Sequence, residues 1–171
     1  MFNIKEKSIR KQLKKLQQKR QKHRLVIAPV KSIAVLNNPQ SGLSFENLKY
    51  VQKTLGFSSS QFDIFTFKQK NDNYNELRGI VASKDIFSSF GKIKTPEINV
   101  FLEKKYDLLL DFTGLTNIYE KFLSFSIQAN CRVGYLDPEE SYDIMLNIKN
   151  GDIKNFADET YRYLKIIGLI G

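Results

Sequence analysis

The chain has 171 residues, of which 42% are hydrophobic and 26% charged, as in an ordinary globular domain. One cysteine, Cys131, and one histidine, His23, exclude internal disulfides and zinc sites built from cysteine and histidine. No apolar run approaches the ~20 residues of a membrane span. The single cysteine is typical of a reducing compartment, and we expect a cytoplasmic protein.

The net charge of +9 is concentrated at the N-terminus. Residues 1–24 hold ten lysines and arginines and one acid, whereas the rest of the chain carries 17 basic and 17 acidic side chains. We therefore expect a basic helical arm, residues 1–28, and a single α/β domain, residues 29–171. The ten cations of the arm are Lys5, Lys7, Arg10, Lys11, Lys14, Lys15, Lys19, Arg20, Lys22 and Arg24.

Residues 3–24 are predicted to form a helix because they contain no glycine or proline and are rich in lysine, glutamine, leucine and arginine. The helix would be roughly 30 Å long at 1.5 Å per residue. Ile9, Leu13 and Leu16 make a narrow apolar stripe, and the other faces are basic. We expect this helix to protrude from the domain.

Strands and helices are predicted to alternate after Pro29. Ser44 and Gly56 fit the two ends of one helix, and Pro96 fits the start of another. Strands are expected at 32–36, 62–67, 106–112, 131–135 and 142–148, with one or two short strands within 77–94, including 79–82. Helices are expected at 45–55, 96–105, 115–129 and from 152 onwards. The core faces of the last two helices would include Ala129 and Tyr163, respectively. This order predicts a Rossmann-like α/β fold, a mostly parallel sheet with helices on both faces.

Two loops are expected to meet where parallel strands end and α/β proteins bind ligands. Their polar groups and glycines could hold a phosphate or a nucleotide, although no GxGxxG or Walker motif is present. Ordinary turn and capping roles are the alternative. The residues are Asn38, Ser41 and Gly42 in one loop, and Thr113, Gly114 and Thr116 in the other.

Other candidate groups favour structural roles. Asp111, near a strand end, could be an acid, a magnesium ligand or a hydrogen-bonded structural residue. The acidic loop of Asp137, Glu139 and Glu140 lacks the spacing of a calcium site. His23 is expected at the surface and Cys131 in the core. We predict no catalytic residue, metal or cofactor, and favour a binding protein over an enzyme.

The basic arm is the strongest functional feature of the sequence. Ten cations on one helix suit the phosphate backbone of RNA, especially ribosomal RNA or the ribosome, without reading bases. Base stacking is not expected, since the only aromatic residue of the arm is Phe2. The alternatives are a protein neighbour in a complex, simple docking on the domain, and a membrane surface, for which the apolar stripe is thin.

The sequence resembles two known families, one over a short region and one over most of the chain. Tyr106–Gly114, followed by Ala129–Tyr135, resembles the N-terminal half-domain of heptosyltransferase-type glycosyltransferases. That resemblance implies the fold alone, because those enzymes bind the sugar nucleotide with a second domain. The whole chain is similar to a small family of Bacteroidota α/β proteins of unknown function, which share the basic helix and the Asp-Leu-Leu-Leu-Asp strand. This family implies a bacterial protein and brings no catalytic residues.

Overall fold

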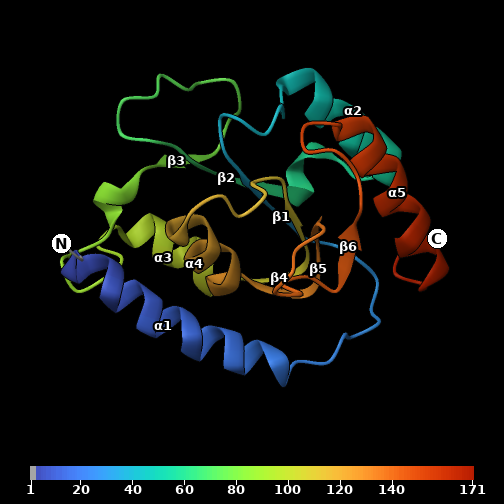
Figure 1. Cartoon of the computed structure of the whole chain (residues 1–171). Coiled ribbons are helices and arrows are strands. Elements are labelled where there is room, and N and C mark those ends of the chain that lie inside the picture. Colours follow the sequence, from blue (N-terminus) through green and yellow to red (C-terminus); the bar gives the residue numbers. More distant parts are fainter. Residues whose placement is uncertain (1–2) are drawn as a thin grey trace.

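A parallel β-sheet forms the centre of the molecule in the computed structural model, which describes residues 3–171 (Figure 1). The strand order is β3-β2-β1-β4-β5-β6, and every pairing is parallel. The strands are β1 (Ile33–Asn37), β2 (Phe62–Phe67), β3 (Ile80–Ala82), β4 (Lys105–Asp111), β5 (Gln128–Tyr135) and β6 (Ile144–Leu146). The Rossmann-like prediction is confirmed.

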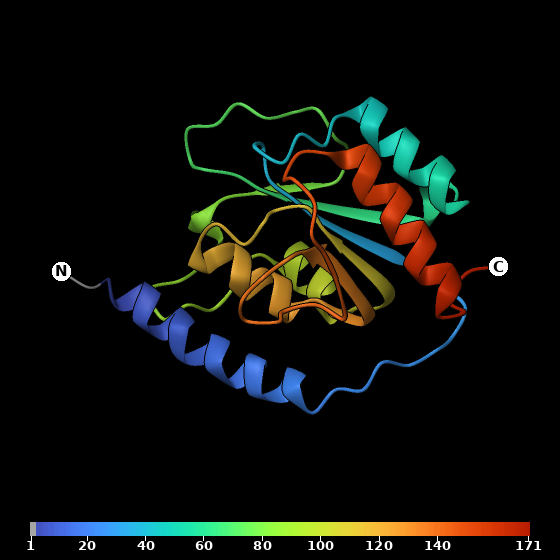
Figure 2. The same ribbon diagram turned by 45° about the vertical axis from the view of Figure 1, so that its right-hand side comes forward.

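Helices cover both faces of this sheet (Figure 2). The helices are α1 (Ile4–Gln21), α2 (Phe45–Leu55), α3 (Pro96–Glu103), α4 (Ile118–Ser126) and α5 (Ile153–Ile166), with short 3-10 turns at Ser59–Gln61 and Lys84–Ile86. One hydrophobic core lies between the sheet and the pair α2 and α5, and a second lies between the sheet and the pair α3 and α4. None of the described helices is long and apolar enough to cross a membrane.

The strand order places a topological switch point between β1 and β4. The chain runs outward from β1 through β2 to β3, then returns to add β4 on the other side of β1. The adjacent strand ends are in register, with Leu36 opposite Asp111. The two loops that follow β1 and β4 therefore leave the same edge of the sheet side by side.

Local capping chemistry explains the boundaries of several elements. The Ser44 side chain accepts a hydrogen bond from Asn47 N at the start of α2, and Gly56 ends that helix at φ 78°. The predicted helix 115–129 is too long at both ends. It begins at Ile118 because the Asn117 side chain caps it and Leu115 has φ 53°. It ends at Ser126, and Ala129 belongs to β5 rather than to a helix face.

Two further predictions about packing are corrected. Tyr163, expected in the core, is 36% exposed, because Phe156, Ala157, Thr160 and Leu164 form the buried face of α5. The basic helix α1 does not protrude. It lies along the body against α4, because its apolar stripe finds a hydrophobic surface there (Figure 1).

Candidate functional site: a basic helix docked beside the strand-end loops

The inner side of α1 is anchored by apolar contacts. Ile9 is fully buried and Leu13 is 5% exposed, and Ile9 is part of the hydrophobic core that also contains Phe87, Tyr119 and Phe122. Fully burying a side chain of this size contributes roughly 1.5–3 kcal/mol. The stripe recognised in the sequence is therefore used to hold the helix on the domain.

Polar side chains fix both ends of the helix. Ser8 Oγ donates to the carbonyl oxygen of Phe90 at 2.5 Å, and Lys5 Nζ donates to that of Lys84 at 3.5 Å. Near the other end, the Arg20 guanidinium lies 2.5 Å from Asp143 Oδ1, and only 17% of the arginine side chain is exposed. Two of the ten predicted cations, Lys5 and Arg20, are thus partly occupied in docking α1.

The outer side of α1 is a continuous cationic surface. Eight of the ten cations predicted for residues 1–24 are exposed, six of them on α1 and two directly after its end, and in the described part of residues 1–24 the only acid is Glu6, which is half-buried. We call this surface the basic face; it consists of Lys7, Arg10, Lys11, Lys14, Lys15, Lys19, Lys22 and Arg24. At 1.5 Å per residue, α1 extends it over ~27 Å. Because the apolar stripe points inward, these side chains are turned toward solvent.

A polar groove runs between the basic face and the start of α4. It has a volume of about 510 Å³ and is lined by Arg10 and Lys14 of α1, Thr116 of a strand-end loop, and Lys121 and Glu139. Lys121 Nζ lies 3.0 Å from Glu139 Oε1, so that lysine is already paired. Arg10 and Lys14 therefore supply the charge available to an anion in this groove.

The two predicted ligand loops do meet at the switch point. Asn38 Nδ2 donates to the carbonyl oxygen of Thr113 at 3.1 Å, which joins the loops directly. The same amide donates to Glu120 Oε1 at 2.9 Å, and Thr116 Oγ1 donates to Glu120 Oε2 at 2.7 Å. Ser41 Oγ donates to the side chain of Asn37 within the first loop. The polar groups proposed for a ligand are bonded to one another.

The glycines of these loops contact protein atoms. A Cβ on Gly114, which has φ 69°, would lie 2.8 Å from Asn150 Nδ2. A Cβ on Gly42 would lie 3.4 Å from the backbone of Gly151. The turn that precedes α5 thus packs over both loops at the positions where backbone would approach a ligand. Of the six residues predicted for these loops, Thr116 is the one that lines the groove beside α1.

Asp111 is a fully buried acceptor of hydrogen bonds. Its Oδ1 accepts from the backbone and hydroxyl of Thr113 at 3.0 and 2.6 Å, and its Oδ2 accepts from Ser124 Oγ at 2.7 Å and Tyr142 OH at 2.8 Å. Burial raises the pKa of the Tyr142 phenol well above its ordinary value, and Asp111 adds to the shift. Every acceptor direction of this carboxylate is occupied within the protein, which favours its structural interpretation.

Arg132 supplies the compensating positive charge, and sequence patterns gave no indication of this role. Its side chain is 2% exposed and donates to the carbonyl oxygens of Ser124 and Ile127 at 2.6 and 3.1 Å. Nη2 also donates to Ser124 Oγ at 2.8 Å, and that hydroxyl donates to Asp111. Burial lowers the pKa of the Arg132 guanidinium to about 10, so it stays charged at neutral pH.

The remaining sequence candidates lie apart from any reactive arrangement. Glu139 accepts a hydrogen bond from Gln17 Nε2 at 3.1 Å, which ties the acidic loop of Asp137, Glu139 and Glu140 to α1. His23 Nε2 lies 3.2 Å from the carbonyl oxygen of Asn130, and the residue is exposed. Burial raises the pKa of the Cys131 thiol to about 12. Among residues 3–171 no group of three or more His, Cys, Asp or Glu side chains could hold a metal ion.

A further cavity lies at the edge of the sheet where the strands begin, away from the switch point. It measures about 1130 Å³ and is bordered by α2, α3 and the first residues of β2 and β3. Phe45 and Val100, 52% and 68% exposed, flank it, and the Lys104–Asp63 ion pair (2.6 Å) lies in its wall. The sequence did not indicate this cavity. It depends on the pairing of β3 with β2, which starts only at Phe65 and leaves the first residues of β2 without a neighbouring strand on that side.

One comparison with known proteins gives a match, and it covers nearly the whole fold. The chain matches the model of a family of unknown function, DUF6913, over residues 5–167. No curated protein and no solved structure matches it. The matched region includes all but the first residue of α1 as well as the complete sheet. The chain therefore belongs to the DUF6913 family.

Proposed function

We propose that the protein binds RNA, with ribosomal RNA as the favoured partner, through the phosphate-binding basic face of α1. The observation that carries this proposal is the division of α1 into two sides. Ile9, Leu13 and Arg20 hold the helix on the body, whereas six cations remain exposed along the ~27 Å of the helix and two more directly follow it. Docking the helix therefore leaves most of its charge available to a polyanion.

The packing of α1 favours a polyanion over a lipid bilayer. Helices that lie in a membrane interface insert a broad apolar face between the headgroups. On α1 that face would be the stripe of Ile9 and Leu13, which is buried against the domain. Membrane insertion would require the helix to detach, whereas phosphate binding requires no rearrangement of the fold.

Like-charge repulsion within the basic face also supports a polyanion partner. Arg10 with Lys14, and Lys11 with Lys15, are spaced four residues apart, which opposes an isolated helix by a few tenths of a kcal/mol per pair. Phosphates placed between these side chains would remove that repulsion and release the counterions of the nucleic acid. The body supplies the rigid support that keeps the cations on one surface.

The experiment compares two variants of equal charge. In the first, Lys11, Lys14, Lys15 and Lys19 of the basic face become glutamine. In the control, exposed lysines on the opposite layer of helices are changed in the same way: Lys49, Lys53, Lys154 and Lys165. Binding of a fluorescein-labelled RNA duplex of about 16 base pairs is measured by anisotropy at about 0.15 M salt.

The basic-face variant is expected to lose about a hundredfold to a thousandfold in affinity, since each phosphate contact contributes strongly at this salt concentration. The control variant is expected to bind within about threefold of the wild type, because long-range screening weakens the effect of distant charges. Equal loss in both variants would mean that net charge alone matters, and it would contradict a defined binding surface.

A further inference from the structure

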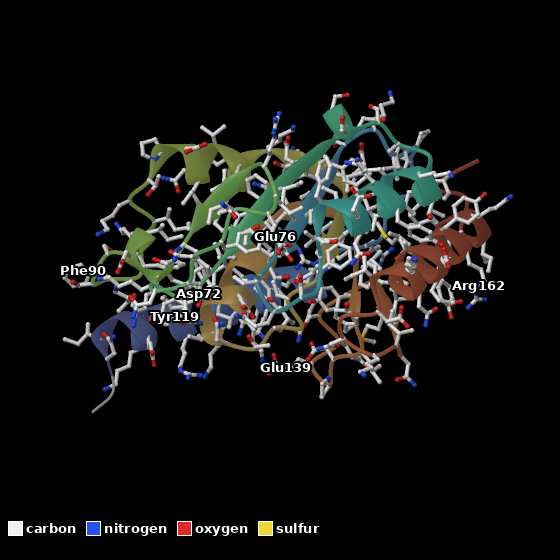
Figure 3. All side chains as sticks on the ribbon, turned by 90° about the horizontal axis from the view of Figure 1, so that it is seen from above. Asp72, Glu76, Phe90, Tyr119, Glu139 and Arg162 are labelled. Carbon is white, nitrogen blue, oxygen red and sulfur yellow. The ribbon has the colours of Figure 1, made fainter. Side chains whose placement is uncertain are left out.

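We propose that Phe90 is a stacking platform for an unpaired base of the RNA bound along α1, so that the preferred substrate is single-stranded or bulged RNA. This inference rests on the proposed function and adds the class of RNA. Phe90 is 72% exposed, the highest fraction among the exposed hydrophobic side chains of the described residues. Figure 3 shows it at the periphery of the molecule beside α1.

A tight turn presents this side chain. Ser88 N donates to the carbonyl oxygen of Lys92 at 2.7 Å, and Gly91 N donates to that of Ser88 at 3.0 Å. The base of the turn is closed by an antiparallel bridge between Phe87 and Ile93. Phe87 is 1% exposed and its ring lies 5.4 Å from that of Tyr119. One phenylalanine thus anchors the turn in the core, and Phe90 extends from its tip.

The tip of the turn is fastened to α1. The carbonyl oxygen of Phe90 accepts from Ser8 Oγ at 2.5 Å and from Gln12 Nε2 at 3.3 Å. Gly91 has φ 71°, and a Cβ there would lie 3.0 Å from Ile9 Cγ1. The backbone that carries Phe90 is therefore held before any ligand binds, so that stacking a base on the ring costs little conformational entropy.

Cationic residues flank Phe90 in the chain. Lys84, Lys92 and Lys94 belong to the same segment and are exposed, and Lys5 Nζ reaches the Lys84 carbonyl oxygen from α1. The acid of this segment, Asp85, lies 3.7 Å from Lys70. Proteins hold single-stranded nucleic acid with exposed aromatic rings that stack bases and with nearby cations that follow the backbone, and this segment offers both kinds of side chain.

Phe45 gives a matched contrast. It is 52% exposed, but the ammonium of Lys49 covers its ring at 4.4 Å, and Glu46 lies next to it in the chain. A base would have to displace that cation and would meet an acid. Phe45→Ala therefore removes an exposed ring of the same kind from a surface that is not suited to RNA.

The test measures the binding of two RNAs of similar charge to the wild type and to three variants. The RNAs are a single strand of uridines containing one 2-aminopurine, whose fluorescence reports stacking, and a blunt duplex. The proteins are the wild type, Phe90→Ala, Phe90→Tyr and the control Phe45→Ala. Phe90→Ala is expected to bind the single strand about fivefold to a hundredfold more weakly, with loss of the fluorescence change. Its affinity for the duplex, and both affinities of Phe90→Tyr and Phe45→Ala, are expected to stay within about threefold.

The outcomes separate this inference from the proposed function. If the wild type binds the single strand and Phe90→Ala binds it equally well, stacking by Phe90 is overturned while RNA binding stands. An equal loss for the single strand and the duplex also overturns it, because a duplex offers no free base. If the wild type binds neither RNA, both proposals fail. If Phe90→Ala instead loses binding to phosphatidylserine vesicles while RNA binding is unchanged, Phe90 contacts a membrane, which contradicts the inference.

Discussion

The basic face of α1 and the polar residues at the strand ends were both candidates for binding, and the fold treats them in opposite ways. On α1 and directly after it, eight cations are exposed, and the one acid of this helix, Glu6, is half-buried. At the strand ends, Asn38, Thr113 and Glu120 are bonded to one another, and Asp111 accepts four hydrogen bonds. Polar groups that bond to one another inside the protein contribute stability, whereas charged groups exposed to solvent are accessible to a ligand.

The comparison predicts that substitutions at the buried strand ends change stability, whereas substitutions on the basic face change binding. Arg132→Met has the largest expected effect on stability. It leaves Asp111 buried without its charge partner and removes the donors for two buried carbonyl oxygens. Breaking a buried charge network of this kind costs about 3–5 kcal/mol. Urea denaturation measures the change, with the exposed Arg162→Met as the control, for which less than about 1 kcal/mol is expected. Equal losses in both variants would contradict a buried network at Arg132.

Ile9→Ala addresses how α1 is attached. Removing this fully buried side chain from the interface of α1 with the core is expected to cost about 2–4 kcal/mol. Amide hydrogen exchange in α1 should accelerate more than exchange in the central strands, because the helix opens locally when its anchor is lost. Ile4→Ala is the control, since Ile4 is 68% exposed. Unchanged exchange in α1 of the Ile9 variant would mean that the polar contacts alone hold the helix.

Gly114→Ala tests the closed packing over the strand-end loops. Gly114 has φ 69°, and the new Cβ would lie 2.8 Å from Asn150 Nδ2. Backbone strain and this clash together are expected to cost about 2–3 kcal/mol. In the control, Gly56→Ala, the φ of 78° is similar but no atom lies within 4 Å, so only the backbone strain of about 1 kcal/mol is expected. If both variants lose the same free energy of unfolding, the loops at the switch point are open.

Glu120 gives the smallest expected effect, a dependence of stability on pH. Burial raises the pKa of its carboxyl in the folded state above the ordinary value of 4.5. Folding therefore favours the protonated form, and this stabilising contribution is complete below that ordinary value and is lost as the pH rises through the folded-state pKa. Relative to Glu120→Gln, the wild type should lose stability between acidic and neutral pH. A difference between the two proteins that is constant with pH would contradict the raised pKa.

The sequence contained most of the fold because its local patterns agreed with one another. The bounds of α2 and β2 follow from residues that act locally, namely Ser44, Gly56 and the alternation of Phe62–Phe67. The meeting of the two strand-end loops followed from strand order alone. The start of α4 was predicted too early because an asparagine such as Asn117 can either continue a helix or cap one. In the structure its side chain accepts hydrogen bonds from the first turn, so the helix begins after it.

The sequence could not give the properties that depend on residues far apart in the chain. Arg132 becomes a core residue because Ser124 and Ile127 turn their carbonyl oxygens toward it. Phe90 becomes a neighbour of the basic helix because Ser8 and Gln12, about 80 positions earlier, bind its backbone. The body thus places an exposed aromatic side chain beside α1, whose own residues include none.

The salt dependence of RNA binding tests the central claim, that exposed cations on α1 bind phosphates, most directly. The logarithm of the association constant is measured against the logarithm of salt concentration for the wild type and for the variant with glutamine at Lys11, Lys14, Lys15 and Lys19. Each lost phosphate contact reduces the slope by about 0.7–0.9, so the variant should be shallower by about three. Equal slopes for the two proteins, or wild-type binding that does not change with salt, would contradict a binding surface on α1.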